Sequence, residues 1–196
     1  MQLSQGAHDL SITLSQSSNA KLRFGSVSVL KYIYVIMGVR RMDEQILSVE
    51  HKMIAGHLAL ISASAFAGAA LYVNVAEQPA RLMLDDQALL SEWKPSYKRG
   101  FAMQAPLAAI GCIFGLIAWW HARELGFLVG AVLMIANWPW TLLGIMPTNH
   151  ALMAIDPANT TPQTRSLIVK WGTLHAVRSV FGLLATIAFL LGCISN

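Results

Sequence analysis

Four long apolar stretches dominate the pattern of hydrophobic and polar positions along the chain. They cover residues 53–73, 101–120, 125–146 and 174–194, and each is close to the roughly 20 residues that a helix needs to cross a bilayer. None shows the alternation of apolar and polar residues that a membrane barrel strand requires. The pattern therefore predicts an all-α integral membrane protein, a four-helix bundle formed by residues 53–196.

The composition supports a membrane protein. Hydrophobic residues make up 55% of the chain and charged residues only 12%, whereas an average soluble domain carries about 25% charged residues. The net charge of +4 could suit nucleic acid, but basic residues in a protein with several spans usually flank the spans and set their orientation. We therefore expect the lipid bilayer, and no nucleic acid, as a partner. Cys112 and Cys193 fall inside predicted spans and are expected to pack there.

Residues 1–52 differ from the rest of the chain. Residues 1–26 are polar and hold few large apolar side chains, which favours disorder. Residues 27–39 are apolar, but this stretch contains Lys31 and is too short to span a bilayer. No small-residue cleavage site of a signal peptide follows it. We expect a poorly ordered or interfacial N-terminal extension.

The segments between the spans predict the orientation. Residues 74–100 and 147–173 are expected as two long loops on one side of the membrane, with the turn 121–124 and both termini on the other. If residues 1–52 are set aside, the long loops carry most of the Lys and Arg residues, and the positive-inside rule places them in the cytoplasm. We expect a multi-pass protein of the inner (plasma) membrane of a bacterium.

Polar residues that could do chemistry gather at the long-loop end of the spans. Asn74, Glu77 and Arg81 lie at i, i+3 and i+7, so they share one face if the first helix continues past Val73.

The segment 85–100 brings further polar and aromatic residues to the start of the second span. Trp93, Tyr97 and Arg99 precede the span, and Gln104 follows Tyr97 by seven residues on a similar face. An interfacial belt of aromatic and snorkelling basic residues is the alternative interpretation for Trp93 and the lysines beside it.

The fourth span opens with His175 and Arg178, which lie at i and i+3 on one face. An ionisable residue inside a membrane span is costly, although the cost falls near the end of the span. Arg178 could therefore simply snorkel to the interface. His175, if it faces the bundle, needs a hydrogen-bond partner, and Glu77 at the same end is the expected one.

The third span ends in NWPWTLLGIMPTN, residues 137–149. Four of these residues fall on one helical face: Asn137, Trp140, Thr141 and Gly144. Pro147 is expected to stop the helix, and Thr148 or Asn149 could then cap its end or face a ligand. We interpret the stretch as a helix terminator whose face lines a site through Trp140 and Asn149.

Metal and nucleotide motifs are weak or absent in the sequence. Glu77, His150 and His175 could form a set of two histidines and a carboxylate, but the chain holds no H-E-x-x-H and no paired E-x-x-H motif. It also lacks a G-x-S-x-G elbow, a phosphate-binding glycine loop and a dinucleotide fingerprint. We expect no metal and no organic cofactor, with a metal-dependent oxidase as an open alternative.

Four motifs together resemble the anthrone-oxygenase-like family of small four-helix integral membrane proteins. They are NVAEQPAR, EWKPSYKRG, PWTLLGIMPTN and LHAVRSVFG, in the expected order between about Met53 and Asn196. Fungal members of that family convert polyketide anthrones to anthraquinones, and most bacterial members carry only a domain-of-unknown-function label. The matching positions are Asn74, Glu77, Arg81, Trp93, Tyr97, Arg99, Trp140, Pro147, Thr148, Asn149, His175 and Arg178.

The resemblance implies an oxygenase that needs no organic cofactor and acts on a hydrophobic small molecule. His175 would be the general base, because histidine changes its charge near neutral pH, and Glu77 would orient it. Arg178, with Asn149 or Tyr97, would stabilise the enolate oxygen that develops. Trp93 and Trp140 would stack on a flat substrate.

A non-catalytic membrane protein, such as a carrier or accessory subunit, is the alternative from a different class. Four helices enclose little volume, and the sequence holds no internal repeat typical of transporters. A homo-oligomer would relieve this objection and is left open. A closed pocket at the polar end of the bundle would favour an enzyme, and a polar path through the membrane would favour transport.

Overall fold

The computed structural model describes Val35, Met37, Gly38 and residues 53–195. The expectation for residues 1–52 therefore lies almost wholly outside the described residues. Within them every regular element is a helix, and no strand is present.

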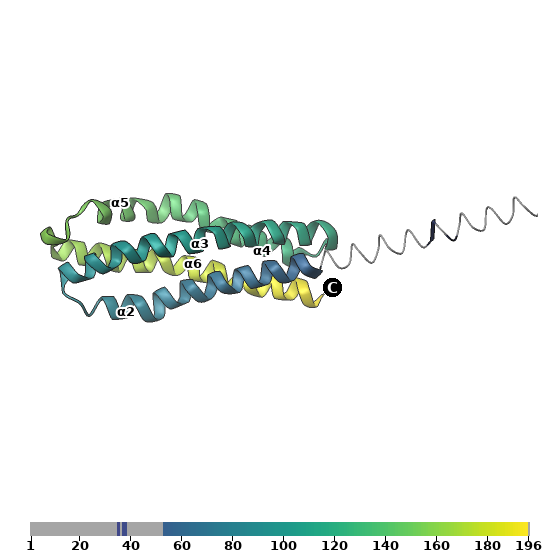
Figure 1. The fold of residues 1–196 in the computed structure, drawn as a ribbon, viewed down its shortest axis with the longest axis horizontal. Helices are drawn as coiled ribbons and strands as arrows, with labels where there is room; N and C mark the ends of the chain where they lie inside the picture. The colour runs from purple at the N-terminus through teal and green to yellow at the C-terminus, as the bar shows by residue number, and fades with distance from the viewer. Residues whose placement is uncertain (1–34, 36, 39–52, 196) are drawn as a thin grey trace, which may run out of the picture. The chain divides into compact units, whose positions relative to one another are not determined.

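Four helices are long and apolar enough to cross a membrane, which confirms the predicted all-α membrane fold (Figure 1). They are Met53–Arg81, α3 (Asp86–Ala122), the continuous helix Leu125–Ala154 and α6 (Pro162–Ile194). The first ends in the π-helical segment η1 (Val73–Glu77) and α2 (Gln78–Arg81). The third consists of α4 (Leu125–Trp140), the π-helical segment η2 (Thr141–Ile145) and α5 (Met146–Ala154).

The helices extend well past the predicted spans, and most residues expected in long loops are helical. The 37 residues of α3 reach about 55 Å at 1.5 Å per residue, against a hydrocarbon core of about 30 Å. Short connections remain, and capping residues define their ends. The Asp85 carboxylate accepts from Ala88 N at 2.8 Å, and Thr161 forms a capping box with Thr164 before α6.

Both π-helical segments end two residues before a proline, Pro79 after η1 and Pro147 after η2. A proline ring in a regular helix clashes with the carbonyl four residues earlier. Those carbonyls, of Val75 and Leu143, lie inside the two wider π turns, which relieve the clash and let the chain continue. The expectation that Pro147 stops the helix was therefore wrong, because the helix runs on to Ala154.

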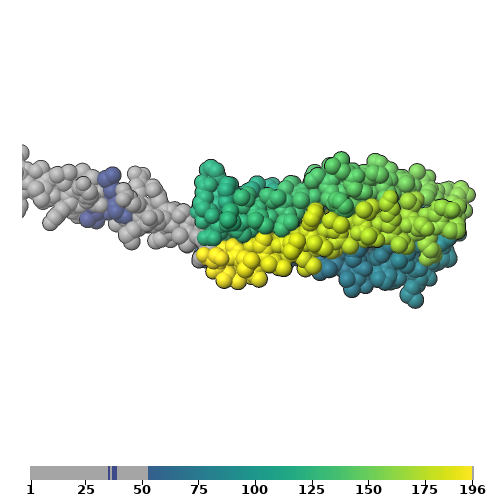
Figure 2. Space-filling model, turned by 180° about the vertical axis from the view of Figure 1, so that it is seen from behind, coloured from purple at the N-terminus to yellow at the C-terminus, as the bar shows by residue number. Residues whose placement is uncertain are grey.

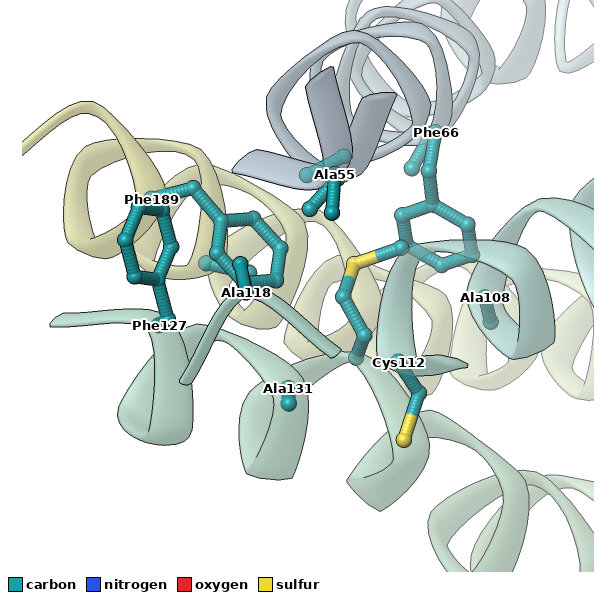
Figure 3. Packing of buried hydrophobic residues seen from close by; sticks show 13 residues of the cluster. Ala55, Phe66, Ala108, Cys112, Ala118, Phe127, Ala131 and Phe189 are labelled. Atoms are coloured by element: carbon teal, nitrogen blue, oxygen red, sulfur yellow. The ribbon is translucent and has the colours of Figure 1, made fainter. Parts of the chain in front are cut away.

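The end of the bundle away from these π turns is filled with aromatic and small side chains. Phe66, Phe127, Phe189 and Met134 are fully buried among alanines. Figure 3 shows Phe127 and Phe189 side by side at one end of this cluster, with Phe66 further along. The cluster joins residues from all four helices, so close packing of apolar side chains stabilises this half of the molecule.

Glycines allow α4 and α6 to approach closely, and Figure 2 shows α6 running along the green α4–α5 helix. A Cβ atom added at Gly126 would lie 2.6 Å from Ala188 O and 2.8 Å from Gly192 N. These neighbours are backbone atoms of α6, so they cannot rotate away as a side chain could. Gly126 is therefore a packing requirement of the fold.

Gly126→Ala should destabilise the bundle, because the added methyl group forces α4 and α6 apart. We expect a loss of about 1–3 kcal/mol in the free energy of unfolding, typical of overpacking, measured by circular dichroism during unfolding in detergent. Gly68→Ala is the matched control, because nothing lies within 4 Å of its Cβ position. Equal stability of the two variants would contradict the close approach.

Candidate functional site

A cavity of about 330 Å³ lies among the four helices at the end that holds η1 and η2. Each helix contributes to its wall, and both π-helical segments do, through Val73 and Glu77 of η1 and Thr141 and Ile145 of η2. Eight predicted site residues line it: Glu77, Arg81, Tyr97, Arg99, Gln104, Asn149, His175 and Arg178.

Four predicted site residues lie behind this wall. Trp93 is buried and stacks on Tyr97, with 5.1 Å between ring centroids. Trp140 donates its Nε1–H to Leu174 O at 3.0 Å and so ties the third helix to α6. Thr148 is buried outside the cavity lining. Trp93 and Trp140 therefore do not form the stacking surfaces of the cavity, which was the expected role of both.

Asn74 is the fourth predicted site residue that lies behind the cavity wall. It forms a hydrogen bond with His175 and determines which ring nitrogen of His175 carries the proton. Asn74 Nδ2 donates to Gly172 O at 2.8 Å, and a backbone carbonyl can only accept, so Asn74 Oδ1 faces the other way. His175 Nδ1 lies 2.9 Å from that oxygen, which also only accepts. The proton of neutral His175 is therefore on Nδ1, and Nε2 carries the lone pair. Within the described part of the chain Nε2 has no hydrogen-bond partner.

The expected pairing of Glu77 with His175 was wrong. Asn74 and Gln78, four residues apart, both point at α6, where Gln78 Nε2 donates to Ile168 O at 2.9 Å. Glu77 turns instead toward α3. Its carboxylate forms an ion pair with Arg81 and accepts from Ser96 Oγ at 2.6 Å.

Arg81 is the centre of a charged cluster between the first helix and α3. It contacts Glu77, and its Nε lies 3.0 Å from Glu92 Oε2. Ser96 Oγ also lies 2.8 Å from Glu92 Oε1, and because a hydroxyl has one proton it donates to only one of the two carboxylates at a time. The two carboxylates balance the charge of this buried guanidinium, so Arg81 connects the first helix to α3 in the cavity wall.

Arg178 has no such compensation. Arg178 is only 7% exposed, and it makes no ion pair with any carboxylate in the described ranges. Its Cζ lies 5.4 Å from the centroid of the Phe66 ring, and its Nε is buried without a hydrogen-bond partner. A buried, uncompensated cation beside a cavity is suited to bind a negatively charged oxygen of a ligand.

Trp171 supplies the aromatic wall that sequence reasoning did not find. It lines the cavity, its ring centroid lies 5.0 Å from that of His175, and Trp93 packs edge-on against it. Trp171 lies four residues before His175 on α6, so helical spacing from His175 would have indicated it. Ser96 was also missed, and nothing in its local sequence distinguishes it.

The cavity is lined by exposed side chains of the first helix and α3. Tyr72 is 64% exposed, Met103 50% and Phe101 42%, and all three line the cavity. They flank the predicted span boundaries at residues 73 and 101. The exposed part of the cavity lining therefore lies at the predicted boundaries of two spans.

The metal set considered from the sequence does not form. Among residues 53–195 no three His, Cys, Asp or Glu side chains come close enough together to hold a metal ion. His150 lies exposed on α5, whereas Glu77 and His175 face the cavity.

Comparison with known proteins identifies the family. The family model described as anthrone oxygenase matches residues 93–188. The chain is 32% identical over 139 residues to the anthrone oxygenase tpcL of Aspergillus fumigatus, covering 66% of this chain and 86% of that protein. The chain belongs to the anthrone oxygenase family. An anthrone oxygenase of Claviceps purpurea is 26% identical over 153 residues, which cover 71% of this chain and 88% of the relative.

Membership of the anthrone oxygenase family supports an oxygenase-like function for this integral membrane protein. The matched range 93–188 includes His175, Arg178 and Trp171, while Asn74, Glu77 and Arg81 precede it. These related anthrone oxygenases are fungal proteins. No solved structure matches the chain.

Removing Arg81 should destabilise the protein, because two neighbouring carboxylates lose the cation between them. We expect Arg81→Met to lower the free energy of unfolding by about 2–4 kcal/mol, less than for a fully buried pair because the Glu92 side chain is 35% exposed. Adding Glu77→Gln should recover part of the loss, with a coupling of about 1–3 kcal/mol in a double-mutant cycle. Additive effects of the two substitutions would argue against the cluster.

Proposed function

We propose that the protein is a membrane-embedded monooxygenase that oxidises an anthrone-like phenolic or polycyclic substrate with O2. The observation that carries the proposal is His175, whose Nδ1 proton is bound by Asn74 and whose Nε2 is unpartnered among the described residues at the cavity. A base in this state, one helical turn from an uncompensated arginine, suits removal of a proton from a carbon acid.

The reaction balances with O2 as the only co-substrate. His175 Nε2 removes a proton from the CH₂ group opposite the ketone, and the electron pair passes into the rings as an enolate. The enolate carbon then bonds one oxygen atom of O2, and the resulting peroxide takes the proton from His175. Loss of the second proton from that carbon breaks the O–O bond, releases water and forms the new C=O bond. The CH₂ group supplies all four electrons that reduce O2.

Arg178 would stabilise the enolate. Negative charge gathers on the ketone oxygen as the proton leaves, and a pre-positioned guanidinium lowers the energy of that state more than that of the neutral ketone. Because Arg178 has no carboxylate in the described ranges to neutralise it, its charge is available to the substrate. Arg81, held by Glu77 and Glu92, has a structural task instead.

Trp171 would provide the flat surface on which the substrate rests. Its ring lines the cavity beside His175, and aromatic rings stack favourably in offset arrangements. The opening at Tyr72, Phe101 and Met103 would admit a hydrophobic substrate from the bilayer, and O2 is also more soluble in lipid than in water. Lipid and a hydrophobic small molecule are therefore the partners we propose.

A carrier function is less well supported. The cavity draws its walls only from residues 69–81, 96–104, 141–149 and 171–178, all at one end of the helices. Phe66 lies next to the cavity-lining Arg178, and the half of the bundle beyond it is packed with buried side chains such as Phe127 and Phe189. A pocket blocked on that side favours chemistry within it over passage through the membrane.

Replacing His175 should remove catalysis. Purified His175→Ala is expected to lose about 10²–10⁴-fold in O2 consumption on emodin anthrone, the contribution of a general base, measured above the spontaneous oxidation rate in protein-free micelles. His57→Ala, an exposed histidine outside the cavity, should retain wild-type turnover. Unchanged turnover in His175→Ala would remove His175 from the mechanism, and no wild-type turnover on any anthrone would refute the substrate class.

Asn74→Leu should slow proton removal by about tenfold or more, because His175 loses the partner that keeps its proton on Nδ1. Gln78→Leu is the matched control, since it also removes an amide bonded to an α6 carbonyl but makes no contact with His175. With substrate deuterated at the CH₂ group, the isotope effect on turnover should increase in Asn74→Leu only. Parallel changes in both variants would reduce Asn74 to a structural role.

A further inference from the structure

Two primary amides line the cavity with buried carbonyl oxygens that have no hydrogen-bond partner among the described residues. Gln104 of α3 and Asn149 of α5 are each only 1% exposed. Neither Gln104 Oε1 nor Asn149 Oδ1 has a hydrogen-bond partner in the described ranges. Asn149 Nδ2 approaches Met146 Sδ at 3.9 Å, and a thioether is a weak acceptor.

These amides differ from others in the same part of the molecule. Asn74 and Gln78 donate to backbone carbonyls of α6 at 2.8 and 2.9 Å and so join two helices. Gln78 Oε1 also has no partner among the described residues, but Gln78 does not line the cavity. Among the described residues, Gln104 and Asn149 make no such bond to a backbone carbonyl of another helix, and their carbonyl oxygens stay unpartnered, although burial of an unsatisfied polar group is costly. An apolar side chain would serve packing better at both positions, so the two amides are suited to bind a ligand in the cavity.

The positions of Gln104 and Asn149 indicate which part of a ligand they would contact. His175 and Arg178 approach the cavity from α6, whereas Gln104 and Asn149 project from α3 and α5. The ketone and the CH₂ group of an anthrone-like substrate would be engaged by the α6 pair. The amides would then face the edges of the outer rings, where substituents lie.

We propose that Gln104 and Asn149 are specificity-determining residues that bind ring hydroxyl groups of the substrate. A phenolic hydroxyl donates its proton to an amide oxygen and accepts from an amide nitrogen, so it matches these side chains. A hydroxyl next to the ketone is already bonded internally to that ketone. The amides therefore select for hydroxyls further from it, on a polyhydroxylated aromatic substrate.

The inference rests on the proposed function, but binding tests it without turnover. The probes are 2,6-dihydroxyanthraquinone and unsubstituted anthraquinone, which share the ring system and have no CH₂ group to oxidise. Dissociation constants follow from quenching of tryptophan fluorescence, because Trp171 lines the cavity. Each variant is compared with wild type for the same ligand in the same detergent, so partition into micelles cancels.

The dihydroxy compound should bind wild-type protein about tenfold or more tightly than anthraquinone, as expected for two hydrogen bonds. Gln104→Leu and Asn149→Leu should each reduce that preference about fivefold and leave anthraquinone binding within twofold of wild type. Leucine has the branched side chain and the heavy-atom count of asparagine and one heavy atom fewer than glutamine, and Gln104→Met replaces Gln104→Leu if the latter does not fold. Gln87→Leu, on the exposed surface of α3 outside the cavity, should keep the full preference.

Two results would overturn the inference: equal wild-type affinity for both quinones, or equal weakening of both quinones in the leucine variants. Either could occur in a protein that oxidises anthrones, so the proposed function would survive. Conversely, selective binding that depends on the amides, in a protein that oxidises no anthrone, would refute the proposed function and leave the two residues as determinants of ligand binding.

Discussion

The hydrogen bond between Asn74 and His175 is the interaction on which the site depends. It joins Asn74 Oδ1 of the first helix to His175 Nδ1 of α6 across 2.9 Å, and these two helices are far apart in sequence. The nitrogen of the same Asn74 amide donates to Gly172 O. Ser179 Oγ donates to the same Asn74 oxygen at 2.9 Å, which satisfies its second lone pair. The packing of the first helix on α6 therefore determines which nitrogen of the His175 imidazole carries the proton. A change that moves these two helices apart would also change the state of this ring.

The two π-helical segments explain how a bundle of continuous helices makes room for a cavity. Each precedes a proline, and each contributes two residues to the cavity wall. A π turn adds one residue to the helical repeat, which shifts the faces of the residues that follow it. In the first helix this shift separates Asn74 and Gln78, which bind α6, from Glu77 and Arg81, which face α3. Pro79 and Pro147 therefore accompany widened turns in the cavity wall, and neither ends its helix.

Much of the fold could be predicted from hydrophobicity, because apolar runs of about 20 residues have few alternatives to spanning a membrane. The polar end could be located as well, since its ionisable residues cluster in sequence. The partner of His175 could not, because spacing along a regular helix does not anticipate a π turn. The lengths of the helices were also underestimated. Lys94 was considered for an interfacial belt, but it donates to Met153 O and Ile155 O at the end of α5. Only the tertiary structure brings these residues together.

The location of the cavity follows from the same excess of helix length. Its lining segments, 69–81, 96–104, 141–149 and 171–178, each cross a boundary of a predicted span. The predicted span boundaries therefore assign the apolar part of the cavity lining to the depth of the lipid tails, and Glu77, Arg81 and Arg99 to positions beyond or close to the ends of the spans. A charge such as that of Arg178 is far cheaper near this boundary than at the bilayer centre. An amphipathic aromatic molecule that collects at the interface would find both its apolar rings and its polar edge matched there, which is why a site for such chemistry belongs at the end of the spans.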